Sequence, residues 1–258
     1  AGGGGHLGGD MSVMDVLTAL YFQQMNISPE NQDDPERDYF ILSKGHAVEA
    51  YYAVLCAKGF LDLQDVKARF SKFGSPYIGH PNNKLAGMEM NSGSLGHGLP
   101  VAVGLALGNR MSGRANRTYV VMGDGELAEG SVWEGFMSGH MYHLDNLCAV
   151  IDRNRLQISG NTEDVMAQDD LAERVRAFGW HVISVEDGND LDQLNAAFEE
   201  AKNTKGQPTC VIANTIKGKG SAVMENKASW PHHVPNAEEY EQICKDLEER
   251  KEELLHAE

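Results

Sequence analysis

The sequence predicts a doubly wound α/β fold, in which helices cover both faces of a mostly parallel sheet. Four runs of strand length, at 118–122, 147–152, 180–185 and 209–214, are apolar almost throughout, as expected of strands that are buried on both faces. Segments with apolar residues at helical spacing separate these runs. No repeat and no long linker divides the 258 residues, so we expect a single domain over 1–258.

The remaining elements follow from local patterns. A helix is expected over 10–24, where apolar residues recur at helical spacing and Asp10 or Ser12 provides an N-cap. A short apolar strand follows at 39–42. Further helices are expected at 47–58, 62–70, 99–111, 131–141, 169–178 and 191–203, with a charged C-terminal helix at about 237–256.

Composition argues against several functional classes. With 22 Lys and Arg against 38 Asp and Glu, the net charge of -16 disfavours binding to nucleic acid or to an anionic membrane. No apolar run approaches the roughly 18 residues that cross a bilayer, and no signal segment is present, so we expect a cytoplasmic protein. The cysteines, Cys56, Cys148, Cys210 and Cys244, form no CxxC pair, which disfavours a zinc or redox motif.

The stretch GDGELA, at 123–128, directly follows a predicted strand and places Asp124 between Gly123 and Gly125. It formally matches the Gly-x-Gly-x-x-Ala fingerprint of dinucleotide-binding proteins, with Asp145 as the acidic residue further along. However, a carboxylate that faces a pyrophosphate would be repelled by it. The motif alone therefore leaves the dinucleotide interpretation open but weak.

A divalent cation between the carboxylate and a phosphate would replace this repulsion with attraction. Mg²⁺ takes oxygen ligands and commonly joins carboxylates to phosphates, and Ca²⁺ or Mn²⁺ would bind in a similar way. Asn154 follows the next strong strand, one strand–helix–strand unit after Asp124. Because the carboxyl ends of parallel strands meet at one edge of the sheet, we expect these two side chains to share a metal ion. The flanking glycines would let the ligand approach the backbone closely.

A GDG turn followed by D-x-N after the next strand is the diphosphate-binding signature of thiamine diphosphate enzymes. Here GDGELAEGSVWEG and LDNLCAVIDRNRLQISG resemble the transketolase version. The motifs GGGGHLGGDMS, ILSKGHA, IGHP, GSLGHG, NTIKGKGS and SWPHHVPN stand in the order of that family, so the resemblance covers nearly the whole chain. It implies the thiamine diphosphate-binding fold and the transfer of a two-carbon ketol unit from a ketose phosphate to an aldose phosphate.

The resemblance also implies roles for particular residues. The metal ligands would be Asp124, Asn154 and the backbone carbonyl of Leu156. The residues that contact the cofactor would be His46, Gly93, Leu95, Gly123, Gly125, Ile158 and Lys217. The groups around the reacting carbon, acting as hydrogen-bond donors or proton-transfer groups, would be His6, His46 and His80.

Other positions are less well defined by the resemblance. Glu129 and Glu134 match carboxylates that lie near a dimer interface in the family and communicate between active sites there, and they are equally consistent with ordinary surface carboxylates. Where the family commonly has a histidine, this chain has Pro231, and His232 is the candidate replacement. His97 stands where glutamine is frequent in the family.

Full-length transketolases continue into a pyrimidine-binding domain, whose glutamate activates the cofactor. This chain lacks that sequence, so we expect the smaller subunit of a split transketolase, although an excised domain is also possible. The complementary chain would carry the pyrimidine-binding domain, and two copies of each chain would form the active heterotetramer. The groups that recognise the substrate phosphate would lie mostly in that partner, which leaves the particular sugars open.

Two other classes remain open at this point. One is a component of another thiamine diphosphate enzyme, such as the alpha chain of a 2-oxoacid dehydrogenase. The other is a dinucleotide-dependent oxidoreductase or a binding domain without catalytic activity.

Overall fold

The computed structural model describes residues 5–227, 230 and 233–256. Its main sheet contains five parallel strands in the order β1-β2-β3-β7-β6. These strands are β1 (Tyr39–Leu42), β2 (Thr118–Gly123), β3 (Leu147–Arg153), β7 (Thr209–Asn214) and β6 (His181–Val185). A separate antiparallel pair is formed by β4 (Leu156–Gln157) and β5 (Gly160–Asn161). The predicted α/β class is confirmed, and every strand of the main sheet is parallel.

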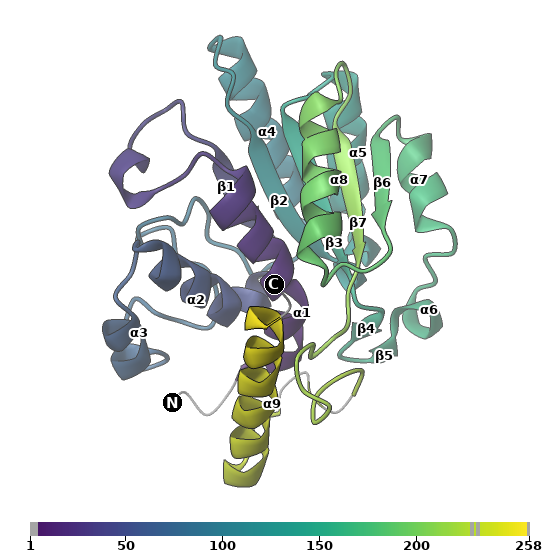
Figure 1. The fold of residues 1–258 in the computed structure, drawn as a ribbon. Coiled ribbons are helices and arrows are strands. Elements are labelled where there is room, and N and C mark those ends of the chain that lie inside the picture. The colour runs from purple at the N-terminus through teal and green to yellow at the C-terminus, as the bar shows by residue number, and fades with distance from the viewer. Residues whose placement is uncertain (1–4, 228–229, 231–232, 257–258) are drawn as a thin grey trace.

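Helices lie on both faces of this sheet (Figure 1). The α-helices are α1 (Leu7–Ala19), α2 (Val48–Lys58), α3 (Leu63–Arg69), α4 (Gly98–Met111), α5 (Gly130–Met141), α6 (Thr162–Val165), α7 (Leu171–Ala177), α8 (Leu191–Asn203) and α9 (Ala237–Leu255). Short 3₁₀ turns at Gly45–Ala47 and Gly125–Ala128 follow β1 and β2. No helix in the described part of the chain is long and apolar enough to cross a membrane.

The strands divide the core into two layers because successive side chains point to opposite faces. On one face, Phe40 and Leu42 of β1 pack in a cluster with α1, α2 and α8. On the other face, Ile41 packs in a second cluster with α4, α5 and α7. The uniformly apolar strands of the sequence therefore correspond to burial on both sides.

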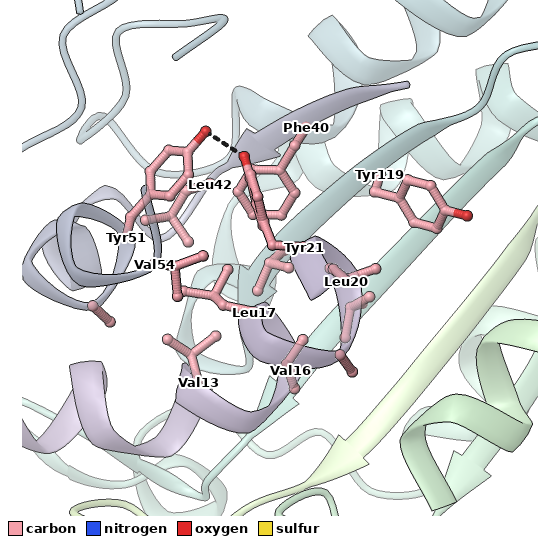
Figure 2. Close-up of a cluster of buried hydrophobic side chains, with 14 of the residues drawn as sticks. Val13, Val16, Leu17, Leu20, Tyr21, Phe40, Leu42, Tyr51, Val54 and Tyr119 are labelled. Atoms are coloured by element: carbon pink, nitrogen blue, oxygen red, sulfur yellow. Dashed lines mark hydrogen bonds between the residues drawn. The ribbon is translucent and has the colours of Figure 1, made fainter. Parts of the chain in front are cut away.

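Aromatic residues connect α1 to the sheet in the first of these layers. Tyr21, just after α1, lies against Phe40, with ring centroids 5.3 Å apart. Figure 2 shows the hydroxyl of Tyr21 directed toward that of Tyr51 on α2, at 2.8 Å. The Tyr51 hydroxyl lies 2.6 Å from the carbonyl oxygen of Gly87, to which it donates. These contacts satisfy the buried hydroxyls while the rings fill the core.

The prediction for the first helix was wrong at its start. The α-helix begins at Leu7, before Asp10 and Ser12, and the last five residues of the predicted span, Leu20–Gln24, form a π-helical turn. Asp10 does not cap its own helix, because its carboxylate accepts from the Ala50 amide in the first turn of α2, at 3.1 Å. The Ser12 hydroxyl donates toward Asp152 at 2.7 Å. Both polar residues are directed toward other elements, which the local pattern does not reveal.

The strand register brings the two predicted motifs together. Gly123 of β2 pairs with Asp152 of β3, and Asp152 pairs with Ala213 of β7. The GDG turn and the loop after β3 therefore start side by side at the carboxyl edge of the sheet. This is the edge at which open α/β sheets bind their ligands.

Candidate functional site

A cavity of about 380 Å³ lies at this edge of the sheet. Its lining includes twelve of the fifteen residues predicted from the sequence: His6, His46, His80, Gly93, Leu95, Gly123, Asp124, Gly125, Asn154, Leu156, Ile158 and Lys217. These residues come from segments spread along most of the chain, so the fold assembles a site that local sequence does not contain. The cavity is large enough for an organic ligand of moderate size.

Asp124 lines the cavity with 2 % of its surface exposed. One carboxylate oxygen accepts from the Gly125 amide at 2.9 Å, and the other accepts from the Arg155 amide at 2.6 Å. Burial, together with the nearby charge of Asp152, raises the pKa of Asp124 to about 6. The ionised carboxylate is therefore costly here unless a cation lies against it.

The loop after β3 folds back toward Asp124. Arg155 adopts a positive φ of 63°, and the Asn154 side-chain oxygen accepts from the Leu156 amide at 3.1 Å. The carbonyl oxygen of Leu156 accepts from the Lys217 ammonium at 2.8 Å. This conformation gathers an amide side chain and a backbone carbonyl on the side of the loop that faces the cavity.

A buried ion pair lies next to this site, and its cationic member, Lys44, also lines the cavity. Lys44 donates to Asp152, and the two side chains are 1 % and 0 % exposed. The Lys44 ammonium also donates to the Gly9 carbonyl at 3.0 Å, and the hydroxyl of Thr215 donates to the second oxygen of Asp152. Lys44 and these hydrogen bonds lower the pKa of Asp152, so this carboxylate stays ionised although it is fully buried. The charge of Lys44 is thus balanced by Asp152, and Asp124 has no ammonium group as a direct hydrogen-bond partner among those described.

The chemistry of these groups suits a hard divalent cation. Asp124, Asn154 and the Leu156 carbonyl offer oxygen atoms, which Mg²⁺ prefers. A positive group, the Lys217 ammonium, already lies at the Leu156 carbonyl. Within the described residues, no group of three His, Cys, Asp or Glu side chains could hold a metal, which disfavours a zinc-type site.

The three cavity histidines come from separate segments. The ring centroids of His6 and His46 are 5.2 Å apart. Burial, reinforced by the positive charge of Lys44, lowers the pKa of His46 to about 2, so its imidazole is neutral at physiological pH. His80 packs against Gly93, where a Cβ atom would lie 2.6 Å from the His80 ring and where φ is +137°. Glycine at position 93 therefore lets the histidine approach the loop.

Three predicted residues are not among those that line this cavity. Glu129 and Glu134 are exposed, at the start of α5, and do not line it. His232 lies outside the described residues. The dimer-interface role that the resemblance implied for the two glutamates stays a prediction.

Sequence reasoning missed several residues that line the cavity, among them Lys44, Glu126 and Gln157. Each lies within a stretch quoted for its motif, in ILSKGHA, GDGELA or DRNRLQISG. Position within a motif was thus the only feature of the sequence that could have indicated these three residues as part of the site. Lys44 and Glu126 have partners on other segments, so their contacts could not be inferred from spacing.

The fold and the site together define a class: an α/β protein whose ligand cavity lies at the carboxyl edge of a parallel sheet. A family profile described as "Transketolase, thiamine diphosphate binding domain" matches residues 1–247. The chain belongs to this transketolase family, and its function is that of a transketolase-type transferase component that uses thiamine diphosphate.

Individual relatives agree with this assignment. The chain is 47% identical over 250 residues to an apulose-4-phosphate transketolase subunit of Phocaeicola vulgatus, covering 97% of this chain and 88% of that protein. It is 41% identical to the 6-deoxy-6-sulfo-D-fructose transketolase subunit SqwG of a Clostridium species, covering 92% of this chain and 86% of that protein. It is 40% identical to human transketolase, covering 89% of this chain and 36% of that protein.

Solved structures show the same relationship. The transketolase of Pichia stipitis in complex with sedoheptulose-7-phosphate matches with a TM-score of 0.89 at 30% identity, over 95% of this chain. The chain spans 37% of that solved chain and 38% of the transketolase from Leishmania mexicana. These matches favour transketolase over the 2-oxoacid dehydrogenase and dinucleotide alternatives.

Proposed function

We propose that this chain is the diphosphate-binding half of a two-chain transketolase, which moves a two-carbon ketol unit between sugar phosphates with thiamine diphosphate and Mg²⁺. The observation that carries the proposal is the convergence of Asp124, Asn154 and the Leu156 carbonyl beside the Lys217 ammonium. The cavity of about 380 Å³ above them has room for the bound part of the cofactor.

In this proposal Asp124, Asn154 and the Leu156 carbonyl hold the cation, which neutralises the diphosphate. Asp124 is suited to this role because two backbone amides stabilise its buried charge, and no ammonium group in the described chain donates to it. Lys217 and the backbone of Gly125 then contact the diphosphate oxygens. When bound, the cofactor supplies the carbon nucleophile that cleaves and forms the carbon–carbon bond.

The three histidines act on the substrate oxygens. His46 is neutral, so its ring can donate one hydrogen bond and accept another without adding charge beside the cation. His6 lies next to it, and His80 lines the cavity from the segment between α3 and α4. We assign these rings to orienting the hydroxyl groups of the sugar and to moving a proton at its carbonyl oxygen.

The partner and the substrate are also proposals. The relatives from Phocaeicola vulgatus and Actinobacillus succinogenes are each named as one subunit of a transketolase, and this chain covers 88% of each. By analogy we assign a complementary chain with the pyrimidine-binding domain, two copies of each chain in the enzyme, and the cytoplasm as its location. Two lysine side chains line the cavity: Lys44 pairs with Asp152, and Lys217 is assigned above to the diphosphate of the cofactor. The group that holds the terminal phosphate of the sugar is therefore assigned to the partner.

Calorimetry on the mixed chains tests the cofactor assignment. Thiamine diphosphate should bind in the presence of Mg²⁺ and not in the presence of EDTA, and NAD should not bind. Asp124→Ala should weaken this binding at least about 100-fold, because the cation loses the carboxylate that this chain provides. Asp33→Ala, in an exposed loop, is the matched control and should bind as the wild type does. Unchanged affinity in Asp124→Ala would refute the metal assignment.

A further inference from the structure

Glu126 is a buried carboxylate that joins three segments of the site. It lies two residues after Asp124 and is 2 % exposed. One of its oxygens accepts from the Ser43 hydroxyl, at the end of β1, and from the Gly96 amide at 2.8 Å. The other oxygen accepts from the Gly123 amide at 3.2 Å. A single side chain thus connects the ends of β1 and β2 to the loop that precedes α4.

The peptide groups of Gly96 are held from both sides. Its amide donates to Glu126, and its carbonyl oxygen accepts from the Ser131 hydroxyl at 2.8 Å. Gly96 has a φ of +86°, and a Cβ atom there would lie 2.6 Å from the side chains of Glu129 and Ser131. The loop can therefore approach the segment that follows the GDG turn only because this position is glycine.

A second connection fixes the other end of the same loop. The Gly98 amide donates to the Ser43 hydroxyl oxygen at 3.1 Å, so this hydroxyl accepts one hydrogen bond and donates its own hydrogen to Glu126. Ser92 donates to the Leu42 carbonyl at 2.6 Å. Between these points the loop carries Gly93 and Leu95, both of which line the cavity.

The ionised form of Glu126 matches these partners. Three donors converge on its two oxygens, which a carboxylate can accept and a protonated acid would partly block. It takes part in none of the ion pairs found among the described residues. Burial raises the pKa of Glu126, and the hydrogen bonds from Ser43, Gly96 and Gly123 oppose this rise, so the side chain is held by the segments whose relative position matters for the site.

We infer that Glu126 is a positioning residue: it fixes loop 91–98 against the GDG turn and so sets where Gly93 and Leu95 meet the cofactor. The inference extends the proposed function and rests on it, because it concerns the same cavity. In this inference other residues carry out the catalytic steps, and Glu126 acts without contacting the substrate.

Hydrogen exchange on the full chain without cofactor tests the positioning directly. Glu126→Ala should accelerate amide exchange in loop 91–98 by about tenfold or more relative to the rest of the sheet, because Gly96 loses its acceptor. Glu126→Gln should give an intermediate rate: its amide oxygen can keep Ser43 and Gly96, while its NH₂ group faces the Gly123 N–H. Glu241→Ala, on the exposed surface of α9, is the control and should leave the loop protected.

Ser131→Ala provides a second test of the loop in case Glu126→Ala does not fold properly. Ser131 is only partly buried, and the change removes the bond to the Gly96 carbonyl without emptying a fully buried position. It should loosen the same loop to a smaller extent. If loop 91–98 stays protected in both Glu126→Ala and Ser131→Ala, or if exchange rises equally throughout the chain in Glu126→Ala, the inference is wrong.

A second measurement connects the loop to the cofactor. In the mixed chains, Glu126→Ala should raise the Kd for thiamine diphosphate by about tenfold to 100-fold, and Glu126→Gln should recover part of this loss. A loosened loop with an unchanged Kd would also overturn the inference. Failure of the wild-type chains to bind thiamine diphosphate would instead count against the proposed function, since the exchange experiment does not depend on the cofactor.

Discussion

At the scale of single residues, the site is shaped by the cost of buried charge. Asp124 and Asp152 are both buried acids, but burial raises the pKa of the first while Lys44 and several hydrogen bonds lower that of the second. The two carboxylates therefore differ in whether their negative charge requires a bound cation. Asp152 is already neutralised within the protein, and Asp124 is available to a cation.

His46 provides a prediction about pH. Its folded pKa is about 2, whereas the ordinary value is 6.5, so the unfolded chain takes up a proton that the folded chain does not bind. Lowering the pH through the unfolded pKa therefore favours unfolding. Between about pH 7.5 and about pH 5.5 this one group should cost about 1.4 kcal/mol of stability.

Urea unfolding of the wild type and of His46→Gln at both pH values measures this contribution. The difference in unfolding free energy between the two proteins should shift by that amount against the wild type on acidification, while contributions from the carboxylates largely cancel. A difference that stays constant with pH would show that His46 titrates normally in the folded chain.

The sequence predicted the residues of the site that carry distinctive motifs but not those that support them. Asp124 and Asn154 follow strands that are apolar almost throughout, so their meeting at one sheet edge follows from the α/β pattern alone. Glu126 and Lys44 have partners that are distant in the sequence, at Gly96 and Asp152. Contacts of that kind depend on how loops pack, so they cannot be predicted from the spacing of apolar residues along the sequence.

At the scale of elements, α4 connects loop 91–98 to the sheet. It begins at Gly98, at the end of the loop that Glu126 holds, and a Cβ atom at this position would lie 2.3 Å from the Ser43 side chain. The small residue thus lets the first turn of the helix pack on the end of β1. The sequence predicted a helix at 99–111, but not that the glycine just before this span makes the close contact.

Two alanine substitutions in α4 test this contact. Gly98→Ala should lower the free energy of unfolding by about 1–3 kcal/mol, because the added methyl group overlaps Ser43. Gly104→Ala is the matched control in the same helix: a Cβ atom there meets nothing within 4 Å, and the higher helix propensity of alanine should raise stability by about 0.5–1 kcal/mol. Chemical denaturation measures both. Equal effects of the two substitutions would contradict the packing account.

At the scale of the whole molecule, the described residues form an α/β fold around one main sheet. Residues at the carboxyl ends of β2 and β3 line the cavity at the edge of this sheet. Glu129 and Glu134 are exposed, as are the side chains of Met137 and Ile158. The prediction of a doubly wound fold was correct because the pattern of apolar strands and intervening helices determines it. The heterotetramer of two copies of each chain stays a proposal, because it depends on contacts with a partner chain.

The most direct test of the central claim is a coupled assay for ketol transfer between ketose and aldose phosphates, on this chain alone and after mixing with the complementary chain. We predict no turnover by either chain alone, and robust turnover by the mixture that requires thiamine diphosphate and Mg²⁺. Light scattering on the active sample should give the mass of two copies of each chain. Robust turnover by the purified 258-residue chain without a partner would contradict the account.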